Sequence, residues 1–227
     1  MSAALHPYLL PLEKLFAENA NAKVAEGAKK YLRNQFEFYG IAASLRRQLL
    51  ADFLKQFKTP EKNALDAVIY SAWEHPCREM HYAAMELLFK AKKNLEPQSI
   101  EILRYMITHQ SWWDTVDYIA PNLLHHYLKT FPDTKSAIIS NWMTSDELWL
   151  QRSCLLFQLK ARQITDEVLL YQMIEQLSEH KDFFIRKAIG WALRTYARTN
   201  PESVLHFVNS VKLSGLSQRE ALKHLKK

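Results

Sequence analysis

A single carboxylate stands among cationic and aromatic side chains in one regular row of the sequence. Positions 35 residues apart carry, in order, Arg47, Tyr82, Asp117, Arg152 and Lys187. Three of the five are cationic, and a row of cations suits the phosphates of nucleic acid. A carboxylate there would repel phosphate. We therefore expect Asp117 to act on something cationic, such as the electron-poor sugar carbon that forms when a glycosidic bond breaks.

Helical spacing adds two indoles and a further cation to the same face. Trp113 lies one turn before Asp117, Trp191 lies one turn after Lys187, and Arg194 follows three residues later. Aromatic rings among cations can stack on bases or pack on sugars, with about 1–3 kcal/mol per stacked base. The row then predicts a basic surface that holds two indoles and one acid.

The same side chains also have an ordinary structural interpretation. Tryptophans such as Trp112 and Trp191 commonly belong to a protein core. Asp114 or Asp117 can cap a helix or pair with Arg152, which is the usual fate of a half-buried acid. Residue types alone leave both interpretations open. The histidines and cysteines lack the spacing of a known metal site, so we expect no metal.

The elements that must position these residues are predicted to be helices. Apolar residues recur at three- and four-residue steps between prolines and polar clusters, and no alternating strand pattern occurs. Candidate helix starts are Thr165–Glu167, Asn200–Glu202 and Ser217–Glu220. Pro121 lacks the amide that would bond the carbonyl of residue 117, so we expect a bend beside Asp117.

The 35-residue period predicts how these helices are arranged. Helix pairs that stack on their neighbours give periods of this length. We expect an all-α fold, an α-solenoid of HEAT-like helical repeats with a basic concave groove, built as a single domain over residues 1–227. Equivalent positions on the second helix of each pair would then line the concave wall of the groove.

Composition narrows the function classes. The chain has 30 Lys and Arg against 24 Asp and Glu, a formal net charge of +6, which suits a polyanionic partner. Its 4 glycines are too far apart for the glycine-rich loops that hold nucleotide phosphates. The 2 cysteines form no Cys-x-x-Cys pair, and no apolar run reaches membrane length. We expect an intracellular protein without a cofactor or a membrane partner.

Three stretches carry more specific motifs: Ser111–Asp117 (SWWDTVD), Trp149–Arg152 (WLQR) and Phe184–Arg194 (FIRKAIGWALR). Together with shorter stretches such as Leu216–His224, they resemble the AlkD family of bacterial alkylpurine DNA glycosylases. The similarity covers nearly the whole chain, and the W-W-D-x-V-D run is distinctive.

The resemblance implies a HEAT-like solenoid that holds duplex DNA in a basic concave groove. Such enzymes excise N3- and N7-alkylated purines, such as 3-methyladenine and 7-methylguanine, without drawing the base into a pocket. It also implies that Asp117 is the catalytic acid, that Trp113 and Trp191 face the sugar, and that Arg152 contacts the DNA backbone.

The row adds Lys187, Arg194 and Arg47 as further DNA-binding residues. The motifs place no lysine for Schiff-base chemistry, so we expect a monofunctional glycosylase that does not cut the strand. It would act as a monomer, with no obligate protein partner, in the bacterial cytoplasm and at the nucleoid when on DNA. The competing hypothesis is a non-enzymatic HEAT-like module that binds nucleic acid or protein through the same groove.

Overall fold

The computed structural model describes residues 4–225, which are helical throughout except for connecting turns and loops. Within this range no strand forms, and the only bridge of the β type joins Glu37 to Cys77. The all-α, solenoid-like fold is thus confirmed. None of the described helices is both long enough and apolar enough to span a lipid bilayer. The chain divides into two compact units, unit 1 (Met1–Ile102) and unit 2 (Leu103–Lys227), and α6 (Ile100–Thr108) contains the boundary.

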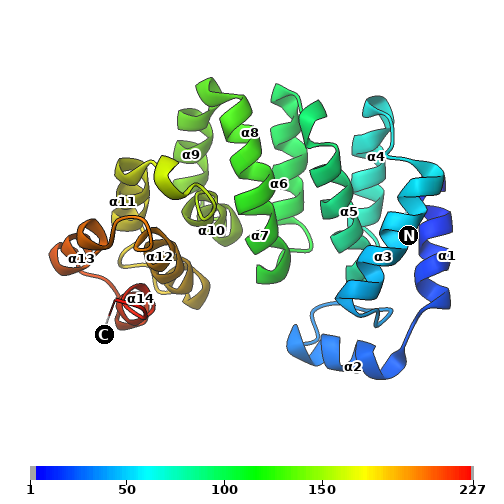
Figure 1. Ribbon diagram of the computed structural model, residues 1–227, viewed down its shortest axis with the longest axis horizontal. Coiled ribbons are helices and arrows are strands. Elements are labelled where there is room, and N and C mark those ends of the chain that lie inside the picture. The colour runs from blue at the N-terminus through cyan, green and yellow to red at the C-terminus, as the bar shows by residue number, and fades with distance from the viewer. Residues whose placement is uncertain (1–3, 226–227) are drawn as a thin grey trace. The chain divides into compact units, whose positions relative to one another are not determined.

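The helices of each unit are labelled in Figure 1. Those of unit 1 are α1 (Leu10–Glu18), α2 (Ala22–Tyr31), α3 (Ala43–Phe57), α4 (Lys62–Trp73) and α5 (Arg78–Lys90). Those of unit 2 after α6 are α7 (Trp113–Ile119), α8 (His125–Thr130), α9 (Lys135–Met143), α10 (Leu148–Leu156), α11 (Glu167–Gln176), α12 (Phe183–Tyr196), α13 (Pro201–Ser210) and α14 (Gly215–Ala221).

Helices of unit 2 stack in a row that follows the 35-residue period. Helix α10 packs against both α7 and α12, and α12 packs against α14. The periodic positions Asp117, Arg152 and Lys187 fall on α7, α10 and α12, so consecutive members of the row lie on neighbouring helices. Unit 1 carries the two earlier positions on α3 and α5. The basic concave groove and the single domain over residues 1–227 stay predictions.

Two of the three expected helix starts are confirmed. The Asp166 side chain accepts from the amide of Leu169 at the start of α11, and Asn200 accepts from the amide of Ser203 at the start of α13. The start expected at Ser217 is wrong. Helix α14 begins at Gly215 because Ser214 caps it, and the Ser217 hydroxyl instead donates to the carbonyl of Arg186.

Pro121 changes the helix that carries Asp117. Helix α7 ends at Ile119, and a π-helical turn over Ala120–Leu124 joins it to α8. Proline has no amide hydrogen for the carbonyl of residue 117, which explains why the α-helical pattern stops here. Single π-helical turns inside helices often occur at functional sites.

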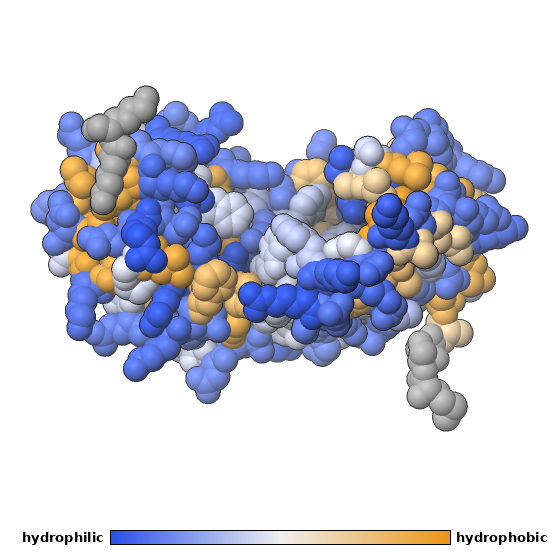
Figure 2. Space-filling view, turned by 90° about the horizontal axis from the view of Figure 1, so that it is seen from below, coloured by the Kyte–Doolittle hydropathy of each residue, from blue (hydrophilic) through white to orange (hydrophobic). Residues whose placement is uncertain are grey.

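Each unit has its own apolar interior and a mostly polar surface. Large residues that are fully buried include Trp73 and Met80 in unit 1 and Tyr127 in unit 2. Figure 2 shows hydrophilic side chains over most of one face of both units, with hydrophobic residues in separate patches. Such patches are common on soluble domains and need no partner to explain them.

A loop of unit 1 depends on one buried carboxylate and one glycine. Glu79 is 1% exposed and accepts from the amides of Tyr39, Gly40 and Ile41 at 3.1, 2.8 and 3.2 Å. Gly40 has φ +85°, and a Cβ there would lie 2.1 Å from the carbonyl oxygen of Asn21. Only glycine fits this position without strain or collision.

We therefore predict that Gly40→Ala lowers the free energy of unfolding by about 2 kcal/mol or more, because both the backbone angle and the space are wrong for alanine. Gly27→Ala is the matched control. Its Cβ would meet nothing within 4 Å inside α2, so it should stabilise by about 0.5–1 kcal/mol through helix propensity. Urea unfolding followed by circular dichroism measures both, and equal effects of the two changes would refute the account of this loop.

Candidate functional site

A cavity of about 370 Å³ within unit 2 brings together six of the seven residues that the sequence singled out. It is lined by Trp113, Asp117, Arg152, Phe183, Phe184, Lys187, Trp191, Arg194 and Glu220. Helix α7 supplies the first tryptophan and the acid, α10 supplies the arginine, and α12 supplies most of the rest. The seventh residue, Arg47, lies exposed on α3 in unit 1, and its predicted role stays a prediction.

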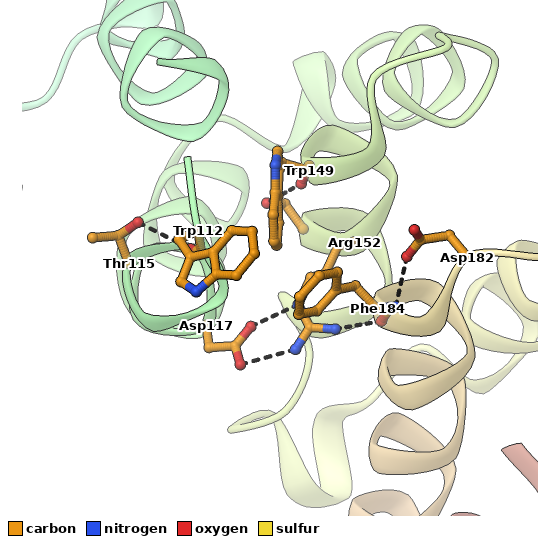
Figure 3. Close-up of polar contacts among 8 residues, drawn as sticks. Trp112, Thr115, Asp117, Trp149, Arg152, Asp182 and Phe184 are labelled. Carbon is orange, nitrogen blue, oxygen red and sulfur yellow. Dashed lines mark hydrogen bonds and ion pairs between the residues drawn. The ribbon is translucent and has the colours of Figure 1, made fainter. Parts of the chain in front are cut away.

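Asp117 and Arg152 form a bidentate ion pair in the lining of this cavity (Figure 3). Nε and Nη2 of the guanidinium donate to Oδ1 and Oδ2 of the carboxylate at 2.8 and 2.9 Å. The third donor group, Nη1, donates to the backbone carbonyl of Phe184. Arg152 is 4% exposed, and the Asp117 side chain is 16% exposed. Paired donors of this kind fix the plane of the carboxylate as well as its position.

Three aromatic rings pack together beside the ion pair. Trp112, Trp149 and Phe184 have ring centroids 5.0–5.8 Å apart. The close-up in Figure 3 shows these rings gathered around the Arg152 side chain. Both Trp112 and Trp191 are half-buried; the ring of Trp112 belongs to this aromatic cluster, whereas Trp191 lines the cavity.

Burial and the ion pair with Arg152 shift the pKa of Asp117 in opposite directions. Burial raises the pKa of the Asp117 carboxyl, because the charged form loses contact with water. The hydrogen bonds and charge of Arg152 oppose that rise, and the nearby carboxylate of Asp114 adds to it. The outcome is a pKa above the ordinary value of an aspartic acid. A carboxylate tuned in this way inside a cavity is a common mark of a functional site.

The two predicted cations on α12 are held by a residue that the sequence interpretation missed. Glu220 of α14 accepts from Lys187 Nζ at 2.9 Å through Oε1, and from Arg194 Nη1 through Oε2. Glu220 belongs to the Leu216–His224 stretch that supports the family resemblance, but the sequence pattern predicts only that it lies at a helix start. Sequence spacing gave no signal that it faces this cavity.

The cavity therefore has a small positive excess rather than a strongly basic wall. Three cations, Arg152, Lys187 and Arg194, face two carboxylates, Asp117 and Glu220. Its lining includes no amide or hydroxyl side chain, so its polar groups are charged side chains and the indoles. Cations are able to bind phosphate oxygens, and indole rings are able to pack on a sugar or a base. Among residues 4–225, no group of three or more His, Cys, Asp or Glu is arranged to hold a metal ion.

Comparisons with known proteins found a family and a solved structure that resemble the chain. The family model described as "DNA alkylation repair enzyme" matches residues 12–225. A solved structure described as a predicted DNA alkylation repair enzyme from Enterococcus faecalis superposes with a TM-score of 0.85 and 30% sequence identity. That superposition covers 92% of this chain and 98% of the other. No curated protein matches the chain at a significant level.

We predict that Arg152→Gln lowers the free energy of unfolding by about 3–5 kcal/mol, because it leaves the buried Asp117 carboxylate without its cation. The double variant Arg152→Gln with Asp117→Asn should lose less than the sum of the two single losses, since the uncompensated charge is then gone. Chemical unfolding of the four proteins in this cycle gives the coupling. Losses that simply add would show that the pair contributes no interaction of its own.

Proposed function

Since the chain belongs to the DNA alkylation repair enzyme family, we propose that it hydrolyses the N-glycosidic bond of cationic N3- and N7-alkylated purines in duplex DNA. Examples are 3-methyladenine and 7-methylguanine. Family membership places the protein in the repair of alkylated DNA. The observation that carries the finer proposal is the cavity in which a partly buried Asp117, two indoles and three cations converge.

The chemistry of the lesion sets what the protein must supply. Alkylation at N3 or N7 makes the purine positively charged, so the base leaves as a neutral molecule and needs no general acid. The sugar that remains develops an oxocarbenium-like charge as the bond breaks. An enzyme for this reaction needs a negative group near the sugar and a positioned water, and it needs little else.

Asp117 is the group that we assign to the developing sugar charge and to the attacking water. Arg152 uses one hydrogen bond on each carboxylate oxygen, and a carboxylate can accept about four, so each oxygen keeps the capacity to hold a water. Arg152 also counters the effect of burial on the pKa of Asp117 and so favours the charged form. The ion pair with Arg152 therefore fixes the position of the Asp117 carboxylate, favours its charged form and leaves it able to accept a hydrogen bond from water.

Trp113 and Trp191 are assigned to the deoxyribose. They come from α7 and α12 and line the same cavity as Asp117. The faces of indole rings attract positive charge, by about 0.5–2 kcal/mol, so they favour the electron-poor sugar over the neutral one. In keeping with the family resemblance, we propose that the sugar approaches this cavity and that the base is not drawn in.

The cations are assigned to the phosphates that flank the lesion. Arg152, Lys187 and Arg194 line the cavity, and Arg47 is proposed to contact the backbone from unit 1. The formal net charge of +6 favours DNA as the partner of the whole chain. Because the reaction needs only water and a carboxylate, we propose that it uses no cofactor. In keeping with the family resemblance, we propose a monomer that acts on double-stranded DNA without an obligate protein partner, in the bacterial cytoplasm.

We propose a monofunctional enzyme, one that removes the base and leaves the strand intact. Lys187 is the lysine of the cavity lining, and its amine is 2.9 Å from the Glu220 carboxylate. An ammonium held in an ion pair has no free electron pair, so it is a poor nucleophile for a Schiff base with the sugar. The alternative, a non-enzymatic module that binds nucleic acid or protein, uses the same cations and gives Asp117 only a structural role, as the ion-pair partner of Arg152.

We predict that Asp117→Asn binds methylated duplex DNA at least as well as the wild type but releases 7-methylguanine at least about a hundredfold more slowly, because removing one preorganised charged group costs on the order of 3 kcal/mol in the transition state. Single-turnover release with saturating protein measures the rate, and fluorescence anisotropy measures binding.

Asp114→Asn is the matched control, since it removes a neighbouring carboxylate of α7 that does not line the cavity. It should keep a rate within about threefold of the wild type, as expected of a change away from the reacting atoms. If neither the wild type nor the variants release 7-methylguanine while salt-sensitive DNA binding is intact, the proposed enzyme is refuted and the non-enzymatic binding module is favoured.

A further inference from the structure

Helix α14 packs closely against α12 at Gly190. A Cβ added to Gly190 would lie 2.4 Å from Cβ of Glu220 and 2.8 Å from the carbonyl oxygen of Ser217. Ser217 is fully buried, and its hydroxyl donates to the carbonyl of Arg186 at 3.0 Å. Because Gly190 has no side chain, the two helices touch, and the base of the Glu220 side chain is fixed against α12.

From that point the Glu220 carboxylate reaches two cations that lie on one face of α12. Lys187 and Arg194 are seven residues apart, which places them two turns from each other on the same side of the helix. Trp191 lies between them in the helical spacing. One oxygen of Glu220 is 2.9 Å from Lys187 Nζ, and the other accepts from Arg194 Nη1.

Each carboxylate oxygen of Glu220 is paired with a cation. Its side chain is 18% exposed, against 37% for Lys187 and 20% for Arg194. The hydrogen bonds from Lys187 and Arg194 lower the pKa of the Glu220 carboxyl, so it stays charged through the neutral range. The two cations therefore face the cavity with part of their charge already compensated.

We propose that Glu220 is a positioning residue of the candidate site: it holds Lys187 and Arg194 on either side of Trp191 and limits their attraction for DNA phosphate. The inference rests on the proposed function, because it assigns those two cations to DNA. Glu220 touches neither the sugar nor the base. It keeps long, mobile side chains in one arrangement, so that phosphates dock in the register that brings the sugar to Asp117.

This role predicts opposite effects on binding and on rate. Without the Glu220 charge, two cations are free to contact additional phosphates. Affinity for DNA should rise at low salt, and the dependence of log K on log salt should steepen by about 1 for each added contact. The rate of base release should fall, because the cations no longer fix the register and a shift near 1 Å can cost about a hundredfold.

The test compares Glu220→Gln with Glu179→Gln, which removes the same charge from an exposed pair with Lys212. Glu220→Gln should bind DNA at least threefold more tightly at low salt, show a steeper salt slope, and release 7-methylguanine at least tenfold more slowly at saturating protein. Glu179→Gln should match the wild type in the rate of release. Equal behaviour of the two variants would overturn the inference, and so would weaker binding together with a slower rate.

Glu220→Asp keeps the charge but shortens the side chain by one carbon, and it serves if Glu220→Gln does not fold. It should keep the salt slope of the wild type and still release base more slowly. A wild-type rate for this variant would contradict a positioning role.

A readout without activity separates this inference from the proposed function. In the DNA-free protein, nuclear magnetic resonance of the Arg194 side chain should show a rigid guanidinium in the wild type and in Glu179→Gln, and a mobile one in Glu220→Gln. If the wild type releases no alkylated purine, the proposed function fails, and the positioning of Arg194 by Glu220 is decided by this comparison. An equally mobile Arg194 in all three proteins would overturn it.

Discussion

A carboxylate that is buried as deeply as Asp117 needs a cation against it to stay charged, and Arg152 supplies that cation through two hydrogen bonds. The third donor of Arg152 bonds the carbonyl of Phe184 at the beginning of α12. One guanidinium therefore ties α7, α10 and α12 together at the point where their side chains form the cavity. Burying two charges is costly, and this geometry offsets the cost by giving each of the three guanidinium nitrogens a hydrogen-bond acceptor.

Helix α12 then determines what surrounds the acid. Its face carries Lys187, Trp191 and Arg194, and its Gly190 lets α14 approach closely enough to add Glu220. Attraction for DNA and the chemistry of the sugar make opposite demands, since phosphates need cations whereas the sugar cation needs a carboxylate. Under the proposed function the pairing of charges serves both demands. Asp117 is paired with Arg152, and Glu220 with Lys187 and Arg194, so three cations of the cavity lining face two carboxylates.

The sequence anticipated the part of the site that follows the 35-residue period. Asp117, Arg152 and Lys187 occupy equivalent positions, and the stacking of α7, α10 and α12 brings them to one cavity. Glu220 lies outside that period, and its approach depends on a contact at Gly190 that no local pattern reveals. Phe184 contributes a backbone carbonyl, which any residue type could supply. The sequence does not fix the start of α14, because serines suited to capping occur at both 214 and 217.

The central claim, that the charged form of Asp117 drives base release, is tested most directly by the pH dependence of 7-methylguanine release in single turnover. Because burial raises the pKa of Asp117 above its ordinary value of 3.8, the rate should fall on acidification at a pH higher than that value, as the carboxylate takes up a proton. Asp117→Asn should show a low rate without this acid limb. A rate in the wild type that is constant down to the ordinary value, or an acid limb that persists unchanged in Asp117→Asn, would contradict the account.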